Sequence, residues 1–237
     1  THLSKGDIVL LTEMEHHSNI VPWQVVTKRT GATLDYISVQ EDGTLDMDSL
    51  KSKLTSKVKM LSITHASNVL GTINSIKDII NLAHNNETLV MVDGCQSTPH
   101  FKIDVEELDC DFFAFSGHKM LGPTGVGVLY GKQDLLEKME PYQTGGGMIK
   151  EVELQESTWN DIPYKFEAGS PNASQVIGLS YAIDFINKVG INEITNHTEM
   201  LSDYAFKELS KIDGITIYGP SHNRISIVSF NIDGIHS

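Results

Sequence analysis

Short apolar runs alternate with helix-like segments along the first half of this chain, and this alternation restricts the fold more than any other feature. Runs typical of strands occupy residues 8–11, 34–39, 58–64, 89–92 and 112–115, and helix signals occupy 22–31, 46–54 and 75–84. Strands that are apolar throughout are buried on both faces, and helices between them make the strands parallel. We therefore predict an α/β fold, a mostly parallel sheet with helices on both faces.

The second half of the chain is organised differently. The run at 126–130 follows the run at 112–115 too closely for a helical crossover, so we expect an antiparallel pair. Residues 145–171 form a long irregular stretch, a kind of segment that is usually functional or part of an interface. A long helix and a second helix follow, and strands near Ile215 and Ile225 end the pattern. We predict a large domain over 1–187 and the beginning of a smaller α+β domain over 188–237.

Two apolar series are expected to mark the buried faces of these helices. The first helix carries Val176, Leu179, Ala182, Ile183, Ile186 and Val189, and the second carries Leu201, Tyr204 and Leu209.

Charge and cysteine content exclude several classes of protein. The net charge of −13 opposes binding to phosphate backbones and anionic membranes, so we predict no nucleic-acid and no membrane partner. Only Cys95 and Cys110 occur in a chain too long to need disulfides, which suits a reducing compartment. We see no signal peptide, membrane span or metal-ligand spacing, and we expect a cytoplasmic protein, an organellar site not being excluded. Because strand-like runs lie close to both ends, we expect both ends to be cut.

The stretch 111–119 (DFFAFSGHK) delivers a hydroxyl, an imidazole and an ammonium from a buried strand into one tight turn. Desolvation lowers the pKa of a lysine and frees its amine for imine formation, so Lys119 is a candidate nucleophile. Ser116 and His118 have donors that suit a phosphate. The alternative is a surface loop with a solvated lysine.

Asp93 follows the apolar strand 89–92, where a carboxylate without a partner is costly. A protonated pyridine nitrogen is one such partner, because a carboxylate there keeps the ring electron-accepting. Gln96, three residues later, has the length to reach a ring hydroxyl. The alternative is that Asp93 only caps the turn at Gly94.

His16 lies just after the first strand and offers a ring that can stack on a planar group, although a solvated helix entry or a metal ligand are alternatives. Asn68 can donate to a substrate carboxylate or a ring oxygen, or it can be an ordinary loop residue.

Together these segments resemble the class V, fold-type I pyridoxal phosphate (PLP) enzymes, and most closely the SufS-like cysteine desulfurases. The matching segments are 13–23 (EMEHHSNIVPW), 65–72 (HASNVLGT), 92–96 (VDGCQ), 116–125 (SGHKMLGPTG) and 166–172 (FEAGSPN). Their order and spacing extend the resemblance over essentially the whole chain.

The resemblance implies a role for each candidate residue. Lys119 is the lysine that forms the Schiff base with PLP, and His16 is the stacked, catalytic imidazole. Asp93 is the partner of the pyridine nitrogen, and Gln96 is the partner of the ring hydroxyl. The other implied ligands are Ser116 and His118 for the phosphate, Asn68 on the substrate side, and Ser170 for the phosphate bound by the other subunit of a homodimer. Threonine is usual at position 170, and serine keeps the donor.

The implied activity is conversion of L-cysteine to L-alanine, with sulfur passed to an enzyme cysteine and then to an acceptor protein of iron–sulfur cluster assembly. Cys95 and Cys110 do not match the position of that cysteine, which we expect beyond Ser237, as we expect a phosphate-binding threonine before Thr1. Selenocysteine lyase, kynureninase-like or epimerase activity is an alternative on the same residues. A catalytically incomplete structural or assembly piece is another.

Overall fold

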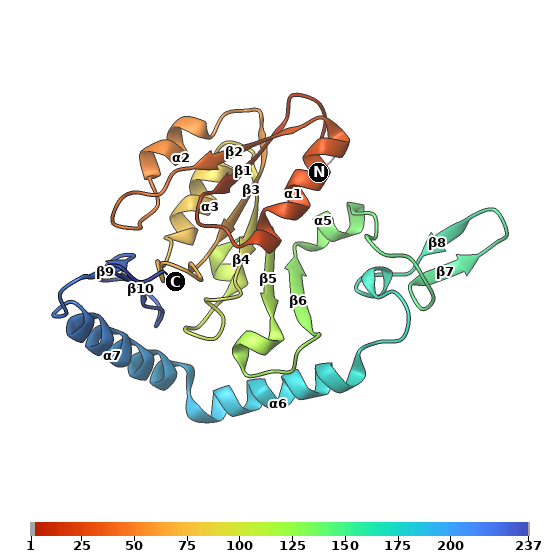
Figure 1. Ribbon diagram of the computed structural model, residues 1–237. Helices are drawn as coiled ribbons and strands as arrows, with labels where there is room; N and C mark the ends of the chain where they lie inside the picture. Colours follow the sequence, from red (N-terminus) through yellow and green to blue (C-terminus); the bar gives the residue numbers. More distant parts are fainter. Residues whose placement is uncertain (1–2, 237) are drawn as a thin grey trace.

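The computed structural model describes residues 3–236 and is built around one six-stranded sheet (Figure 1). The strand order is β2-β1-β3-β4-β5-β6. The strands span Ile8–Thr12 (β1), Thr33–Ile37 (β2), Val58–Thr64 (β3), Leu89–Asp93 (β4), Phe112–Ser116 (β5) and Gly127–Gly131 (β6). The first five run parallel and β6 pairs antiparallel to β5. Both the mostly parallel sheet and the antiparallel last strand were predicted.

Helices cover both faces of this sheet, as the sequence predicted. Leu10 and Ile63 face a core shared with helices α2 (Met47–Lys53), α3 (Ile76–His84) and α4 (Val105–Leu108). Val9 and Leu11 face the opposite core, which contains side chains of α1 (Val21–Thr30) and α5 (Gln133–Lys138). Neighbouring residues of β1 therefore point into different cores, which is why this strand is apolar throughout.

Local signals set the helix ends close to the predicted positions. Asp46 accepts hydrogen bonds from the backbone N–H groups of Asp48 and Ser49 and so caps α2. Gly31 ends α1 with a φ of 78°, a left-handed conformation that favours glycine. Both features depend only on neighbouring residues, so they could be predicted from sequence.

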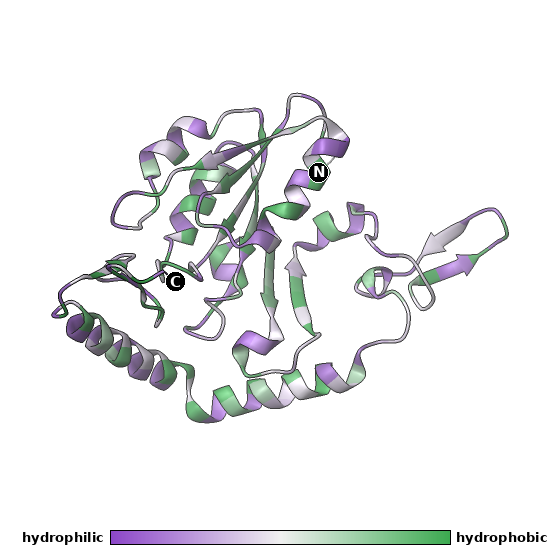
Figure 2. Cartoon of the chain, viewed as in Figure 1, coloured by the Kyte–Doolittle hydropathy of each residue, from purple (hydrophilic) through white to green (hydrophobic). Residues whose placement is uncertain are grey.

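The two long helices are α6 (Ala173–Val189) and α7 (Ile191–Leu209), and their burial differs from the prediction. Leu179, Ala182 and Ile186 are buried, but the other three members of the first series are exposed: Val176, Ile183 and Val189. On α7, Leu201 and Tyr204 are exposed as well. Hydrophobic residues occur along the length of α6 (Figure 2), yet only a narrow stripe packs beside Met120.

Residues 145–171 are not wholly irregular, as had been expected. They contain the antiparallel strands β7 (Ile149–Val152) and β8 (Ser157–Trp159) and the 3₁₀ helix η3 (Tyr164–Phe166). The hairpin projects to one side of the molecule, away from the central sheet (Figure 1). Its polar strands lack the apolar run that marks the other strands.

A separate two-stranded antiparallel sheet, β9 (Ile215–Tyr218) with β10 (Ser229–Ile232), follows α7. The connection between β9 and β10 contacts the loop after β3: the Ile225 N–H in this connection donates to the carbonyl of Gly71 over 2.9 Å. The division into domains at residue 187 stays a prediction. Within residues 3–236, the structure contains no helix with the length and apolar character required to span a bilayer.

Candidate active site

The candidate residues cluster at the carboxyl ends of the parallel strands. The segment containing His16 follows β1, Asp93 ends β4, and Ser116 ends β5. Loops after the carboxyl ends of parallel strands meet at one edge of the sheet, where α/β proteins bind their ligands. Two more candidates, Asn68 and Lys119, lie in the loops after β3 and β5.

Asp93 is a buried carboxylate, 9% exposed. Its Oδ1 accepts the backbone N–H of Cys95 over 2.9 Å, which is an interaction that a turn-capping aspartate makes. Within residues 3–236, however, no ion pair includes Asp93 and its Oδ2 accepts no hydrogen bond. One oxygen of a buried carboxylate thus remains available for a cationic or N–H group of a ligand.

The backbone around Asp93 is fixed on both sides. Asp93 pairs in register with Thr64 of β3 and with Ala114 of β5. Gly94 comes next, and a Cβ at this position would lie 1.9 Å from the ring of Phe113. Only glycine fits there, so the turn that follows Asp93 is packed directly onto β5. Gln96 lies in this turn and is half-buried.

Lys119 lies in the 3₁₀ helix η2 (Gly117–Met120), directly after Ser116 at the end of β5. Its side chain is half-buried, whereas His118 is exposed. Ser116 lies beside the neighbouring loop, since its Oγ is 3.6 Å from the Sγ of Cys95. The structure therefore brings the turns after β4 and β5 together, as the sequence predicted.

The pKa of the Cys95 thiol is affected by both charged candidates, Asp93 and Lys119. Burial raises the pKa of the Cys95 thiol, the negative charge of Asp93 raises that pKa further, and the positive charge of Lys119 lowers it. Charges act measurably on a neighbour only at short range in a protein. The carboxylate of Asp93 and the amine of Lys119 are consequently both close enough to the Cys95 thiol to shift its pKa.

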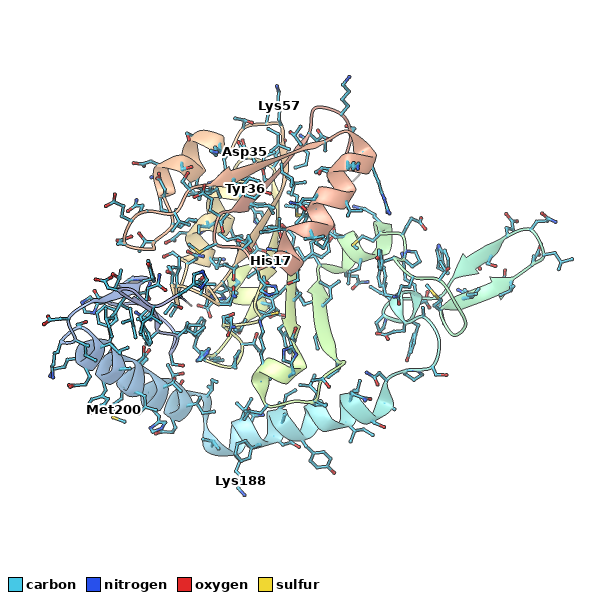
Figure 3. All side chains as sticks on the ribbon, in the orientation of Figure 1. His17, Asp35, Tyr36, Lys57, Lys188 and Met200 are labelled. Atoms are coloured by element: carbon cyan, nitrogen blue, oxygen red, sulfur yellow. The ribbon has the colours of Figure 1, made fainter. Side chains whose placement is uncertain are left out.

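His16 has an exposed ring whose orientation is set locally. The Ser18 N–H donates to Nδ1 over 3.2 Å, and the Ser18 Oγ lies 2.7 Å from the same nitrogen. Because Nδ1 accepts, the proton of the neutral ring is on Nε2. His17, labelled in Figure 3, begins the 3₁₀ helix η1 (His17–Asn19) that leads into α1, and its ring centroid is 5.8 Å from that of His16.

Two candidates have weaker ties to this cluster. Asn68 is half-buried in the loop after β3, and the turn around it is held by Ser67, whose Oγ accepts the N–H groups of the two residues after Asn68. Ser170 is exposed in the loop between η3 and α6. Its predicted role toward a second subunit stays a prediction.

Sequence reasoning missed one feature of the site, the buried carboxyl of Glu15. It is 7% exposed, and burial raises its pKa from 4.5 to about 7 despite hydrogen bonds from Thr12, Thr64 and Asn19. The available signal was an acidic residue four positions before Asn19 and directly before His16. Nothing in the sequence showed that β3 would cover it.

The arrangement combines a carboxylate with one free oxygen, a primary amine, the hydroxyl of Ser116 and an imidazole around one edge of a sheet. Within residues 3–236 no group of three or more metal-ligating side chains lies close enough to hold a metal ion. Such a set can bind a planar, cationic aromatic ring and carry out proton transfer and amine chemistry beside it.

Comparison with known proteins assigns the chain to a family. The model of the aminotransferase class-V family matches residues 1–237. The chain belongs to the class-V aminotransferase family.

The chain is 53% identical over 235 residues to a protein of Halalkalibacterium halodurans named probable cysteine desulfurase. That alignment covers 99% of the chain and 58% of the relative. The solved structure of the cysteine desulfurase CsdA from Escherichia coli matches with a TM-score of 0.95 and 39% identity, over 99% of this chain and 58% of that chain. The α/β fold expected of a fold-type I PLP enzyme is thereby confirmed.

A third structure is more distant. It is a lysine-to-alanine variant of C-DES with glycine covalently linked to its PLP cofactor, and it matches with a TM-score of 0.88 and 26% identity over 98% of this chain and 62% of that one. The chain thus spans less than two thirds of the length of each of these relatives. The resemblance to cysteine desulfurases stated from the sequence is confirmed, while the role of each site residue stays a prediction.

Proposed function

We propose that this class-V aminotransferase acts as a PLP-dependent cysteine desulfurase, which converts L-cysteine to L-alanine and passes the sulfur to an enzyme cysteine. The relatives named above support the activity, and the site supports the chemistry. The observation that carries the proposal is the buried carboxylate of Asp93, which has a free oxygen and no cationic partner within residues 3–236.

The residues fit PLP. A carboxylate that is buried without a counter-ion suits a protonated pyridine nitrogen, and Lys119 supplies an amine whose charge also acts on Cys95. When bound, PLP would withdraw electrons from the α-carbon of an amino acid joined to it through the amino group. Asp93 would hold the ring nitrogen and Gln96 the ring hydroxyl. Ser116, His118 and a partner's Ser170 would hold the phosphate, and the exposed ring of His16 would stack on the pyridine face.

Lys119 has two tasks in this proposal. Its Nζ amine carries the cofactor when no substrate is present, and it then moves a proton at the α-carbon of L-cysteine. Asn68 would donate from its amide to the substrate side. His16, with its proton on Nε2, would keep the ring and the substrate in place.

The sulfur-accepting thiolate in this proposal is neither of the cysteines in the chain. Cys110 is fully buried, and burial raises its pKa to about 11. Cys95 is half-buried with a raised pKa, because burial and Asp93 both oppose its ionisation. A thiolate is the nucleophile in sulfur transfer, and neither side chain supplies one near neutral pH. Residues 1–237 alone would therefore bind PLP without transferring sulfur.

The proposal extends to assembly. A homodimer is supported by the apolar side chains that α6 leaves exposed, among them Ile177, Tyr181 and Phe185. An acceptor protein of iron–sulfur cluster assembly would take the sulfur, and the protein would work in the cytoplasm.

Product analysis tests the proposal. The intact protein with PLP and L-cysteine should yield equal amounts of alanine and sulfide when a thiol reductant is present, and a Lys119→Ala variant should yield neither. Selenocysteine, kynurenine and single amino-acid enantiomers serve as competing substrates. Formation of anthranilate from kynurenine, or of racemised amino acid, with no alanine and sulfide from L-cysteine would contradict the proposal.

A further inference from the structure

The carboxyl of Glu15 is the centre of a buried hydrogen-bond network outside the set of residues assigned above. Its Oε1 accepts the hydroxyl of Thr12 over 2.6 Å and the backbone N–H of Thr64 over 3.0 Å. Its Oε2 accepts the side-chain amide of Asn19 over 2.6 Å. One side chain thereby joins the end of β1, the end of β3 and the 3₁₀ helix η1 that precedes α1.

Asn19 extends the network in a way that fixes its own orientation. Its Oδ1 accepts the hydroxyl of Ser62 over 2.6 Å and the indole N–H of Trp23 over 3.2 Å. Since that oxygen already has two donors, the amide group of Asn19 has to face Glu15. The pair Glu15–Asn19 is therefore directional, with an acceptor on residue 15 and a donor on residue 19.

His16 lies in the segment 15–19, whose two end residues, Glu15 and Asn19, are joined by their side-chain hydrogen bond. Glu15 and Asn19 are bound to β3 at the two ends of the segment, and the Asn19 N–H donates to the carbonyl of His16 over 2.8 Å. The ring of His16 is exposed, and within residues 3–236 its hydrogen bonds go to Ser18 of the same segment alone. The position of this ring therefore depends on the anchors on either side of it.

Glu15 is also coupled to Asp93. Thr64, which donates to Glu15, pairs in register with Asp93 on the next strand. Burial raises the pKa of Glu15 to about 7, and the negative charge of Asp93 contributes to the increase. The groups of β1 and β3 that touch Glu15 are uncharged, and on its own segment Glu13, His16 and His17 are exposed. Asp93 is the ionisable group that acts on Glu15 from a neighbouring element.

We propose that Glu15 is a positioning residue of the cofactor site: its carboxylate anchors the His16 segment to β3, and its proton links that anchor to the charge of Asp93. The three donors around Glu15 occupy three of the four acceptor positions of its carboxylate, two on Oε1 and one on Oε2. A cation paired with Asp93 removes the charge that opposes ionisation of Glu15. The proposal rests on the PLP site proposed above.

The direction of the Glu15–Asn19 pair allows a swap experiment. In Glu15→Gln two amide donors face each other, and in Asn19→Asp two carboxylates do. In the double variant Glu15→Gln/Asn19→Asp, the amide donates from residue 15 and every other donor keeps an acceptor. Glu13→Gln is a matched control, because the carboxylate of Glu13 is exposed and accepts only the N–H of Val39 over 3.1 Å.

The measurements are PLP affinity and the induced circular dichroism of bound PLP in the intact protein between pH 6 and pH 8, about one unit either side of neutrality. Each single variant should bind PLP about tenfold more weakly at pH 8, with reduced induced dichroism, since a buried polar group loses its partner. The double variant should return to within about twofold of the wild type. The affinity ratio of wild type to Glu15→Gln should grow as the pH rises, because only the wild type ionises at residue 15.

The outcomes separate the two proposals. Wild-type protein that fails to bind PLP contradicts the proposed function. Wild-type protein that binds PLP, with single variants of equal affinity and equal induced dichroism, contradicts the role of Glu15. If the single variants do not fold, the double variant still decides: restored binding supports the directional pair, and absence of restored binding contradicts it.

Discussion

Asp93 at the end of β4 and Lys119 in the turn after β5 shift the pKa of one thiol, that of Cys95, in opposite directions. The negative charge of Asp93 raises it and the positive charge of Lys119 lowers it. The carboxylate is buried without a cationic partner within residues 3–236, and the amine comes from a turn that touches Cys95 through Ser116. Two adjacent parallel strands thus hold an acid and an amine in one place. This relationship is the structural basis of the proposed PLP site.

Gly94 should tolerate no side chain. A Cβ there would lie 1.9 Å from the ring of Phe113, so Gly94→Ala has to shift the turn that carries Asp93 or the strand β5. We expect a loss of about 1–3 kcal/mol in the free energy of unfolding, measured by urea denaturation. Gly146→Ala is the control, because a Cβ at that position has no neighbour within 4 Å. Equal unfolding midpoints for the two variants would contradict the packing described here.

Asp111 should be important for stability although it lies outside the site. Its buried carboxylate accepts the N–H of Val90 over 2.7 Å and lies 2.9 Å from the Nε2 of His84 and 3.2 Å from the Nζ of Lys132. Asp111→Ala leaves the buried N–H of Val90 and the Nε2 of His84 without this acceptor, whereas Lys132 keeps its pair with Asp109 at 2.7 Å. We therefore expect a loss of about 1–3 kcal/mol in the free energy of unfolding, measured by chemical denaturation.

The matched control for that experiment is Asp48→Ala. Asp48 is 97% exposed and pairs with Lys51 at 3.7 Å, so its removal should change stability by less than about 0.5 kcal/mol. If Asp48→Ala lowered the free energy of unfolding more than Asp111→Ala did, the proposed role of Asp111 in holding β5 to β4 would be contradicted.

Glu15 should make the stability of the protein depend on pH. Burial raises its pKa from 4.5 to about 7, so the native state holds a proton that the unfolded state has lost between these values. The stabilisation is complete below pH 4.5 and is lost as the pH rises through 7. Relative to Glu15→Gln, the wild type should lose on the order of 3 kcal/mol over that range. Chemical denaturation of both proteins at several pH values measures this difference in the free energy of unfolding. If that free energy changed with pH in the same way in both proteins, the raised pKa of Glu15 would be excluded.

The two thiols should react slowly and to different degrees. The thiol of Cys110 is fully buried with a pKa of about 11, so a disulfide reagent at pH 8 should modify it only after unfolding. Cys95 is half-buried, and burial together with Asp93 raises the pKa of its thiol, so it should react slowly in the native protein. Mass spectrometry of the labelled peptides distinguishes the two. Rapid labelling of Cys110 would contradict its described burial.

Much of the fold could be predicted because its signals are local. The apolar runs of β3 and β4, the cap at Asp46 and the left-handed end at Gly31 each depend on a few neighbouring residues. The antiparallel β6 followed from the short connection after β5. The same reasoning placed Asp93 and Ser116 at strand ends, so the positions of these two candidate residues could be predicted.

What could not be predicted depends on distant partners. The burial of Glu15 comes from Thr64, which is 49 residues away in the chain. Helical spacing predicted that Val176 and Val189 are buried, but both are exposed. Such spacing indicates that a helix has an apolar face and does not show which element packs against that face. The hairpin β7–β8 has no apolar run, and its pairing arises from the chain folding back on itself.

The most direct test of the central claim is to reduce the PLP-loaded protein with borohydride and to map the modified peptide by mass spectrometry. Reduction fixes the cofactor to the amine that carries it. The account predicts a single pyridoxyl group on Lys119, with Asp93→Asn lowering the amount of bound PLP. A pyridoxyl group on another lysine, or none on the wild-type protein, would contradict it.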